Sequence, residues 1–154
     1  MSETRAARVP IEPGFFTIPE DPAQAPRLLA SRCRSCGESY FPRRQLCCAC
    51  FSRDLEATEI GPRGTLYTYT YVRVPMFNRK SSGEGEPGYG VGQVDLPEGP
   101  RVQAVLSGAF EDFRIGMPME LELEALRENP DGQEVVIFRF RPVEGAGPGQ
   151  GAAR

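Results

Sequence analysis

The 154-residue sequence contains no histidine and no tryptophan. The absence of histidine excludes Ser-His-Asp and Cys-His catalysis, histidine metal ligands and a histidine general base. No run of about 18 apolar residues occurs, so no segment is expected to span a membrane. The N-terminal residues lack the apolar stretch of a signal peptide, and we therefore expect a cytoplasmic protein.

A basic excess is also missing, because 18 lysines and arginines stand against 21 acidic residues and give a net charge of −3. This balance argues against a general nucleic-acid-binding protein. The charge is uneven, however. Residues 27–53 carry six arginines and one acid, whereas residues 54–154 carry ten basic and sixteen acidic residues. The sequence therefore predicts a small basic module followed by a larger acidic one.

All five cysteines lie between residues 33 and 50 and form two CxxC pairs, with Cys48 as the odd one. Each CxxC can make a tight knuckle, and two knuckles can direct four sulfurs at one point. The spacing predicts a zinc ribbon with one structural Zn²⁺, whose ligands are Cys33, Cys36, Cys47 and Cys50. Disulfides, a redox CxxC and an iron centre are alternatives, and disulfides are disfavoured in a reducing cytosol.

The rest of the chain predicts a mostly β protein, since 17 glycines and 15 prolines favour turns over long helices. Strands are expected at 65–74, 89–96, 101–107, 119–125 and 135–141, where β-branched, aromatic or alternating residues gather. A connector containing one helical turn is expected at 109–115. Five strands with a connector between the third and the fourth match a five-stranded OB-type barrel.

A short N-terminal helix is expected within residues 18–31, because Asp21 can serve as N-cap and Pro22 suits the first helical position. Residues 76–88 are rich in glycine, serine and charge, and are expected to form a mobile loop. The predicted organisation is a flexible N-terminus at 1–16, the helix and zinc ribbon at 17–60, the OB barrel at 61–143 and a disordered tail at 144–154.

Several motifs occur together in one order. They are the four cysteines with Gly37, the pair Phe41-Pro42 and Arg44, followed by Gly64–Thr70, Val94–Leu96 and Gly116–Pro118. Over about residues 17–142 the chain resembles the zinc-ribbon plus OB-fold proteins associated with acyl-CoA enzymes. Members of that family are small partners of thiolases, of related condensing enzymes and of acyl-CoA hydratases, and one serves anaerobic aromatic degradation. The chain departs from the family at Cys48, where proline is usual, and in the long charged loop at 76–88.

The expected zinc site is structural, because four thiolates leave zinc no open position for water. Four arginines close to the cysteines are expected to offset the charge of the thiolates or to face a partner subunit: Arg32, Arg34, Arg43 and Arg44. Binding of CoA phosphates is the alternative for them. Cys48 is interpreted as a free thiol, since no histidine can activate it as a nucleophile.

Two alternating patterns concern the expected strands. One consists of Tyr67, Tyr69, Tyr71 and Arg73, which are expected on one strand face covering a core or a protein interface rather than stacking on bases. The other consists of Glu120, Glu122 and Glu124, which are expected on a solvated face. Neither pattern is interpreted as catalytic.

These observations and the resemblance together predict a non-catalytic, zinc-containing partner subunit of a thiolase-type acyl-CoA C-acyltransferase complex. The chain would form a hetero-oligomer with a thiolase-like catalytic subunit, shape the acyl-CoA site and assist 3-oxoacyl-CoA thiolysis. Candidate contacts to the partner or to CoA are Arg43, Arg44, Phe77, Arg79 and Lys80. The alternatives are an accessory subunit of an acyl-CoA hydratase and a nucleic-acid-binding OB module.

Overall fold

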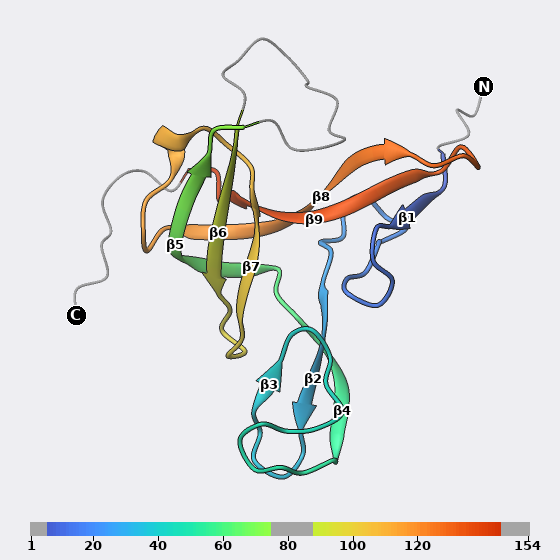
Figure 1. Ribbon diagram of the computed structural model, residues 1–154, viewed down its shortest axis with the longest axis vertical. Coiled ribbons are helices and arrows are strands. Elements are labelled where there is room, and N and C mark those ends of the chain that lie inside the picture. Colours follow the sequence, from blue (N-terminus) through green and yellow to red (C-terminus); the bar gives the residue numbers. More distant parts are fainter. Residues whose placement is uncertain (1–5, 75–87, 146–154) are drawn as a thin grey trace.

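The computed structural model describes residues 6–74 and 88–145, which form two sheets (Figure 1). The larger sheet has six strands and the smaller has three. Phe77, Arg79 and Lys80 lie outside the described residues. Within the described residues, no helix is long and apolar enough to cross a membrane.

The larger sheet contains a closed barrel of five strands. The strands are β5 (Arg63–Val72), β6 (Tyr89–Asp95), β7 (Arg101–Leu106), β8 (Pro118–Glu128) and β9 (Glu134–Pro142). Their order is β9-β7-β6-β5-β8, and pairing of β8 with β9 closes the ring. The pairing of β7 with β9 is parallel, and all the others within the ring are antiparallel. This is the five-stranded OB topology expected from the sequence.

In the barrel strands, alternate residues point into the core, and their side chains fill the barrel. In β6 every second residue is buried, and Gly90 and Gly92 hold two of these inward positions. A Cβ on Gly92 would meet Leu106 Cδ1 at 2.8 Å, so the barrel wall is too close here for any side chain. A 3₁₀ turn, η1 (Phe110–Asp112), lies in the predicted connector, and Phe113 behind it is 2% exposed in the core.

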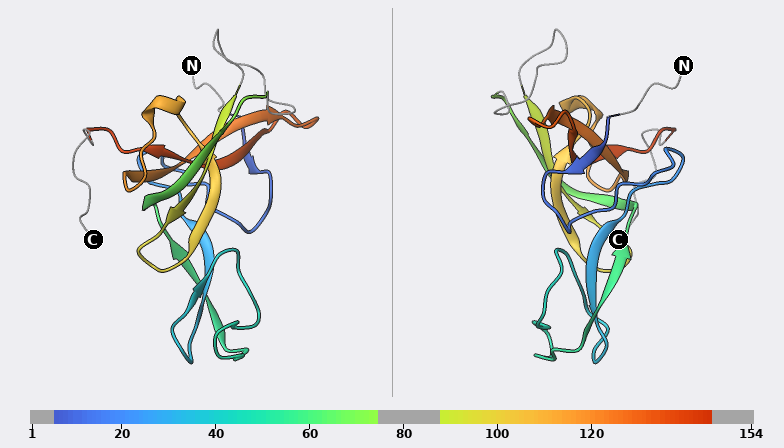
Figure 2. Two further views of the ribbon diagram at one scale, coloured as in Figure 1. Left: turned by 60° about the vertical axis from the view of Figure 1, so that its left-hand side comes forward. Right: turned by 90° about the vertical axis from the view of Figure 1, so that its right-hand side faces the viewer.

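The smaller sheet forms the zinc ribbon and lies at the lower end of the molecule in Figure 1. Its strands are β2 (Leu28–Cys33), β3 (Ser39–Tyr40) and β4 (Leu55–Ile60), in the order β3-β2-β4. β2 pairs antiparallel with both neighbours. The views in Figure 2 show the ribbon directed away from the barrel strands.

Aromatic and aliphatic side chains join the ribbon to the barrel. Leu28, Ala30 and Ile60 of the ribbon strands belong to the same buried cluster as the barrel core. The ring of Phe41, which follows β3, packs edge-on against Phe138 of β9 with centroids 5.9 Å apart. The two sheets therefore share one hydrophobic core.

The helix expected within residues 18–31 is absent, and this prediction is wrong. Asp21 does accept a hydrogen bond from Ala23 N (2.8 Å), but Gln24 N then bonds to Asp21 O and closes a turn. Pro26 cannot donate a helical hydrogen bond, and β2 begins at Leu28. The same residues that suggested an N-cap therefore build an Asx turn.

The N-terminal segment contributes more structure than the sequence indicates. β1 (Arg8–Pro10) pairs in parallel with β9 through Val9 and its neighbours. Phe16 is 5% exposed, and its ring contacts Phe138 with centroids 5.7 Å apart. Residues 8–16, expected in a flexible extension, thus form part of the packed molecule.

The expectation that four alternating residues of β5 share one face is also wrong. The register against β6 shifts between Leu66 and Thr68, which marks a β-bulge at Tyr67. A bulge inserts one extra residue and reverses the alternation beyond it. Tyr67 therefore lies outside, with the Arg101 guanidinium 3.3 Å from its ring centroid, while Tyr69 and Tyr71 pack on Phe110.

Candidate zinc centre and its surroundings

Two similar knuckles present the cysteines. In the first, Gly37 N donates to Cys33 O at 2.9 Å, and Gly37 has a φ of 81°. In the second, Phe51 N donates to Cys47 O at 2.9 Å, and Phe51 has a φ of 60°. Each CxxC thus closes on the residue that follows it, in the left-handed conformation that such a tight turn requires. The sequence spacing is converted directly into two matching loops.

The sulfurs of Cys33, Cys36, Cys47 and Cys50 all lie within 4.8 Å of one another. Two of the Sγ–Sγ distances, Cys33–Cys50 and Cys36–Cys47, are 3.6 and 3.5 Å. A tetrahedral Zn²⁺ with Zn–S bonds of about 2.3 Å needs sulfurs about 3.8 Å apart, so the cluster fits the ion. A disulfide would require about 2.05 Å, and all five cysteines are free. The ribbon therefore carries a structural zinc site, and these four residues would hold the metal.

Tyr40 of β3 supports the second knuckle. Its hydroxyl lies 3.2 Å from Cys47 Sγ and accepts hydrogen bonds from Cys48 N and Ala49 N at 3.0 and 3.2 Å. The hydrogen bond from Tyr40 lowers the pKa of Cys47 to about 6. Sequence analysis missed this residue, because a tyrosine seven positions before a cysteine carries no recognisable signal.

The four thiols differ in their tendency to ionise. For Cys36, the hydrogen bond from the Glu38 backbone lowers the pKa, but the neighbouring thiols and burial outweigh it and raise the pKa to about 12. Adjacent thiolates repel each other, so they do not all ionise unaided. A bound divalent cation removes this conflict because it favours deprotonation of every coordinating thiol. The donor set thus suits a metal ion better than four free thiols.

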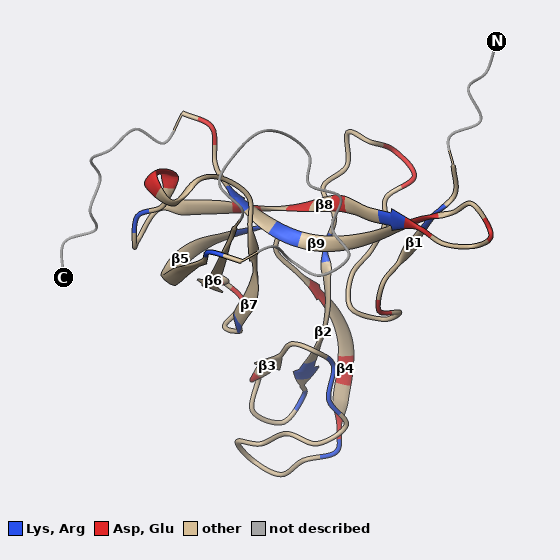
Figure 3. Cartoon of the chain, turned by 45° about the horizontal axis from the view of Figure 1, so that its top comes forward, with Lys and Arg blue, Asp and Glu red and all other residues tan. Residues whose placement is uncertain are grey.

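Arginines and some acidic residues are distributed along the ribbon strands and loops (Figure 3). Arg34 is ion-paired with Glu56 at 3.2 Å and with Asp54 at 3.7 Å. Arg43 Nε donates to Ala30 O at 3.3 Å. Arg44 lies with its guanidinium carbon 5.4 Å from the Tyr40 ring centroid. The arginines are therefore held by the ribbon itself.

Cys48 is exposed and does not join the four-sulfur cluster. Arg44 Nη1 donates to Cys48 Sγ at 3.0 Å. Arginine can stabilise a thiolate but cannot remove a proton from the thiol. The hydrogen-bond partner that the structure gives Cys48 within the described residues is therefore not a base, and the interpretation of Cys48 as a free thiol stays a prediction.

The three glutamates of β8 share one outward face, as expected, but ion pairs keep that face only partly solvated. Arg139 of β9 lies 2.6 Å from Glu122 and 2.8 Å from Glu124, and Arg141 lies 3.3 Å from Glu120. Glu122 and Glu120 stand directly opposite these arginines in the β8–β9 register. The alternation of glutamates in β8 is visible in the sequence, but the arginines that pair with these glutamates belong to β9.

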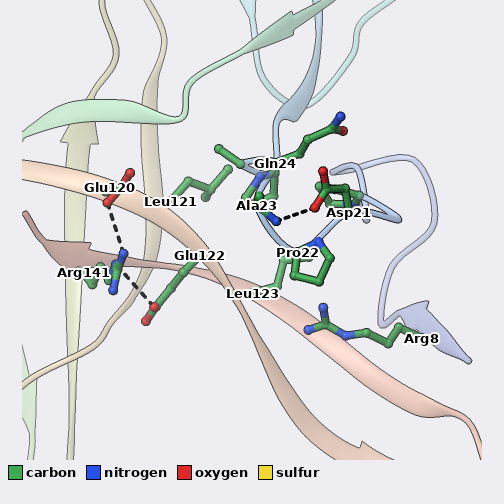
Figure 4. A pocket seen from close by; sticks show the side chains of 13 residues that line it. Arg8, Asp21, Pro22, Ala23, Gln24, Glu120, Leu121, Glu122, Leu123 and Arg141 are labelled. Carbon is green, nitrogen blue, oxygen red and sulfur yellow. Dashed lines mark hydrogen bonds and ion pairs between the residues drawn. The ribbon is translucent and has the colours of Figure 1, made fainter. Parts of the chain in front are cut away.

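We call these ion pairs between β8 and β9 the ion ladder. Its members Glu120, Glu122 and Arg141 line one wall of a groove of about 310 Å³ (Figure 4). The turn at residues 21–26 and Arg8 form the opposite wall. Figure 4 shows Arg141 bonded to Glu120 and Glu122 within the groove rather than directed at open space. The charged lining residues are Arg8, Arg141, Asp21, Glu120 and Glu122, a net charge of −1, and both arginines are ion-paired with glutamates. The groove therefore presents little charge that would select a ligand.

A four-cysteine zinc ribbon joined to a closed OB barrel defines a class of small two-module proteins, and comparisons with known proteins agree. Residues 21–56 match the family described as "ChsH2, rubredoxin-like zinc ribbon domain", and residues 57–124 match "ChsH2, C-terminal OB-fold domain". The chain is 31% identical over 131 residues to benzoylsuccinyl-CoA thiolase subunit BbsA of Thauera aromatica, covering 85% of this chain and 86% of that protein.

Two further relatives cover the same modules. A DUF35 domain-containing scaffold protein of Pyrococcus furiosus is 34% identical over 119 residues, covering 76% of this chain and 84% of that protein. A solved structure described as Ltp2-ChsH2(DUF35) aldolase superimposes with a TM-score of 0.58 at 30% identity, covering 75% of this chain and 84% of that chain. The chain therefore belongs to the ChsH2-type family of zinc-ribbon plus OB-fold proteins.

Proposed function

We propose that this chain is the non-catalytic, zinc-containing partner subunit of a thiolase-type acyl-CoA C-acyltransferase complex. The observation that carries the proposal is its similarity, across ribbon and barrel together, to a protein that is itself a thiolase subunit. The similarity spans most of both chains, so the compared unit is the whole two-module protein rather than one common fold. In this role the chain stabilises the assembly and shapes the acyl-CoA site.

The chemistry of the chain is consistent with a supporting role. Thiolysis of a 3-oxoacyl-CoA needs a nucleophile and groups that transfer protons. The sequence has no histidine. The zinc supplies a structural cross-link when bound, since four thiolates complete its usual coordination. The catalytic residues would therefore belong to a second polypeptide.

The positioning of the ribbon arginines supports contacts across the assembly. Arg43 and Arg44 are exposed, yet their guanidinium groups are fixed by Ala30 O and by Cys48 Sγ. An arginine held in place loses less side-chain entropy on binding a carboxylate or phosphate. We propose these two residues, with Phe77, Arg79 and Lys80 of the segment outside the described residues, as contacts to the partner or to CoA. A reducing cytoplasm would keep the thiols available for zinc.

Related assemblies are the alternatives that the comparisons favour. One relative is described as a scaffold protein and the solved relative as an aldolase, so an aldolase-type catalytic partner is the alternative that they favour. A hydratase partner remains the alternative that the sequence resemblance implies. A nucleic-acid-binding OB module is less favoured. Tyr69 and Tyr71 pack on Phe110 instead of forming an open stacking platform.

The direct test is co-purification of the chain at native expression level from its organism, followed by mass spectrometry of the proteins that accompany it. We expect a thiolase-like subunit in stable proportion. The isolated complex should cleave a 3-oxoacyl-CoA with free CoA, whereas a hydratase or an aldolase as partner would establish the alternative. Recovery of the chain alone, or bound to nucleic acid, would overturn the proposal.

A further inference from the structure

Phe51 is the one non-glycine residue with positive φ in the part of the chain that the structure describes. It occupies the position that Gly37 holds in the first knuckle, and makes the same backbone hydrogen bond to the cysteine four residues earlier. Glycine adopts this conformation freely, but a bulky side chain adopts it at a cost in free energy. The second knuckle would therefore be less strained with glycine at this position.

The Phe51 side chain gains nothing from the rest of the chain in return. It is 74% exposed, more than any other large apolar residue whose exposure the structure gives. No aromatic ring of the described residues packs on it, whereas Phe15, Phe16 and Phe41 all make ring contacts. Phe51 destabilises the isolated chain in two ways, through its strained backbone and through its apolar ring in water. We therefore look for a stabilising contact of this ring with another molecule.

The residues around Phe51 extend this apolar point into a surface. Cys47 N donates to Ser52 O at 2.9 Å, which brings Leu46 and Arg53 together at the base of the loop that carries Phe51. Leu46 is 39% exposed. We call these three residues, Leu46, Phe51 and Arg53, the knuckle tip. It lies on the ribbon, which projects from the barrel (Figures 1 and 2).

The charge around the knuckle tip is positive and largely unpaired. Within the described residues, no carboxylate forms an ion pair with the following exposed arginines: Arg32, Arg43, Arg44 and Arg53. Residues 27–53 carry a net charge of +5. Over the whole ribbon, residues 27–60, six arginines stand against four acids, and a zinc tetrathiolate contributes about −2, so the module as a whole is close to neutral. The positive charge is local, because residues 43–53 carry three arginines and no acid.

The nearest carboxylates in sequence, Asp54 and Glu56, are paired with Arg34, so Arg53, two residues after Phe51, has no carboxylate partner within the described residues. A protruding aromatic residue beside such an arginine fits an apolar pocket with carboxylates at its rim.

We propose that the knuckle tip is the docking point for the catalytic partner subunit, with Phe51 inserted in an apolar, acid-rimmed pocket of that protein. The inference rests on the proposed function and specifies which surface of this chain makes the contact. A protein is favoured over a single-stranded nucleic acid for two reasons. The knuckle tip offers one ring and an aliphatic neighbour rather than successive stacking platforms, and the barrel module is acidic.

The test replaces Phe51 by glycine, the residue that the first knuckle uses. F51G removes the anchor and relieves the backbone strain, so zinc content should stay at one per chain and thermal stability should be unchanged or higher. Affinity for the co-purified catalytic subunit should fall about tenfold or more, as for a buried aromatic anchor. F51N, which also tolerates positive φ, provides a second variant. Loss of affinity together with loss of zinc in both variants would mark a structural role and overturn the inference.

Matched controls separate the knuckle tip from the rest of the surface. I115A alters another strongly exposed apolar residue, 70% exposed, on the barrel module and should leave the affinity within about twofold. R53E should slow association with the partner, most strongly at low salt, whereas R63E on the barrel should not. Equal effects of the knuckle-tip variants and the barrel variants would overturn the inference.

The outcomes also separate this inference from the proposed function. If the wild-type chain binds no catalytic subunit, both the proposed function and the docking site are wrong. A wild-type chain that binds, with F51G and F51N binding equally well, removes only the docking site. A labelled single-stranded oligonucleotide that binds wild type and not F51G, with protein affinity unchanged, would assign the knuckle tip to nucleic acid and overturn protein docking.

Discussion

The hydroxyl of Tyr40 makes three contacts with the second knuckle, which involve Cys47 Sγ, Cys48 N and Ala49 N. The two backbone amides point at the same oxygen, so the hydroxyl proton remains for the sulfur of Cys47. A hydrogen bond to a metal-bound thiolate orients it and restrains its charge, as partners of metal ligands commonly do. Tyr40 thus contributes to the zinc site without being a ligand.

Replacing Tyr40 by phenylalanine tests this contribution. Y40F keeps the ring and removes the hydroxyl, leaving two amides and one thiolate without their partner. We expect zinc affinity, measured by competition with a chromogenic chelator, to fall about 10–100-fold. At saturating zinc the variant should still fold. Y69F, which loses a hydroxyl bonded to Phe113 O far from the cysteines, is the control and should bind zinc like wild type.

The odd cysteine provides an internal comparison for the ligands. Cys36 belongs to the four-sulfur cluster and Cys48 does not. C36S should therefore give a zinc content well below one per chain and a poorly folded ribbon, because a structural zinc contributes about 10–16 kcal/mol to folding in zinc-finger peptides. C48S should keep one zinc and near-wild-type stability. Elemental analysis with circular dichroism measures both; equal zinc content in the two variants contradicts the assignment.

At the scale of strands, β8 and β9 form a hairpin whose charged side chains pair across the strands. Arg139 bridges Glu122 and Glu124, and the side chains of all three residues are less than a quarter exposed. Opposite charges that face each other across an antiparallel pair stabilise its register. Partial burial keeps such a network from being fully screened by salt.

We expect R139Q to lower the free energy of unfolding by about 1.5–3 kcal/mol, the range for hydrogen bonds to charged groups. The reason is that two partly buried carboxylates lose their shared cation. R127Q changes an exposed arginine of β8 and should alter stability by less than about 0.5 kcal/mol. Urea denaturation of the three proteins makes the comparison, and equal stability of R139Q and wild type would show that the ladder contributes nothing.

The same strands show what the sequence could and could not predict. β-Branched and aromatic content, together with alternation, located all five barrel strands to within a few residues, because these signals depend on residues within each strand. The partners of Glu120, Glu122 and Glu124 come from β9, and the bulge at Tyr67 arises from pairing with β6, so both depend on contacts across the sheet. The wrong helix prediction has the same cause, a contact between distant segments. Leu28, which was expected in the helix, instead pairs with Ile60 of β4.

For the zinc site, the sequence predicted the four ligands but not the residues that support them. The CxxC spacing is a local pattern and defines each knuckle by itself. Tyr40 and Phe51 are meaningful only once the knuckles are folded. The position after the second CxxC did hold a usable signal, since Gly37 stands at the matching position in the first pair.

At the scale of the whole molecule, the ribbon and the barrel share a core, and zinc should therefore support both. Phe41 contacts Phe138 of β9, and Leu28 of β2 is 0% exposed within the common cluster. A ligand that binds only the folded state raises the stability of everything that unfolds with its site. Removal of zinc should thus propagate beyond the cysteines.

We expect a strong chelator under reducing conditions to lower the thermal unfolding temperature while leaving a single transition. Hydrogen exchange should accelerate in β9 as well as in β2 and β4, because β9 contributes Phe138 to the junction. Readdition of zinc should reverse both effects. If β9 keeps its protection while the ribbon strands lose theirs, the two modules are energetically independent and the shared core contributes little to their coupling.

The absence of histidine leads to a prediction for the complete molecule. Cys48 is the one exposed thiol outside the zinc cluster, and its neighbour Arg44 donates a hydrogen bond to it rather than accepting its proton. The isolated chain should therefore cleave no 3-oxoacyl-CoA with free CoA above the rate in buffer. C48A should leave the activity of the assembled complex unchanged, because the proposed role assigns the nucleophile to the partner. Turnover by the rigorously purified chain that disappears in C48A would show instead that this subunit carries a catalytic thiol, and the supporting role would have to be abandoned.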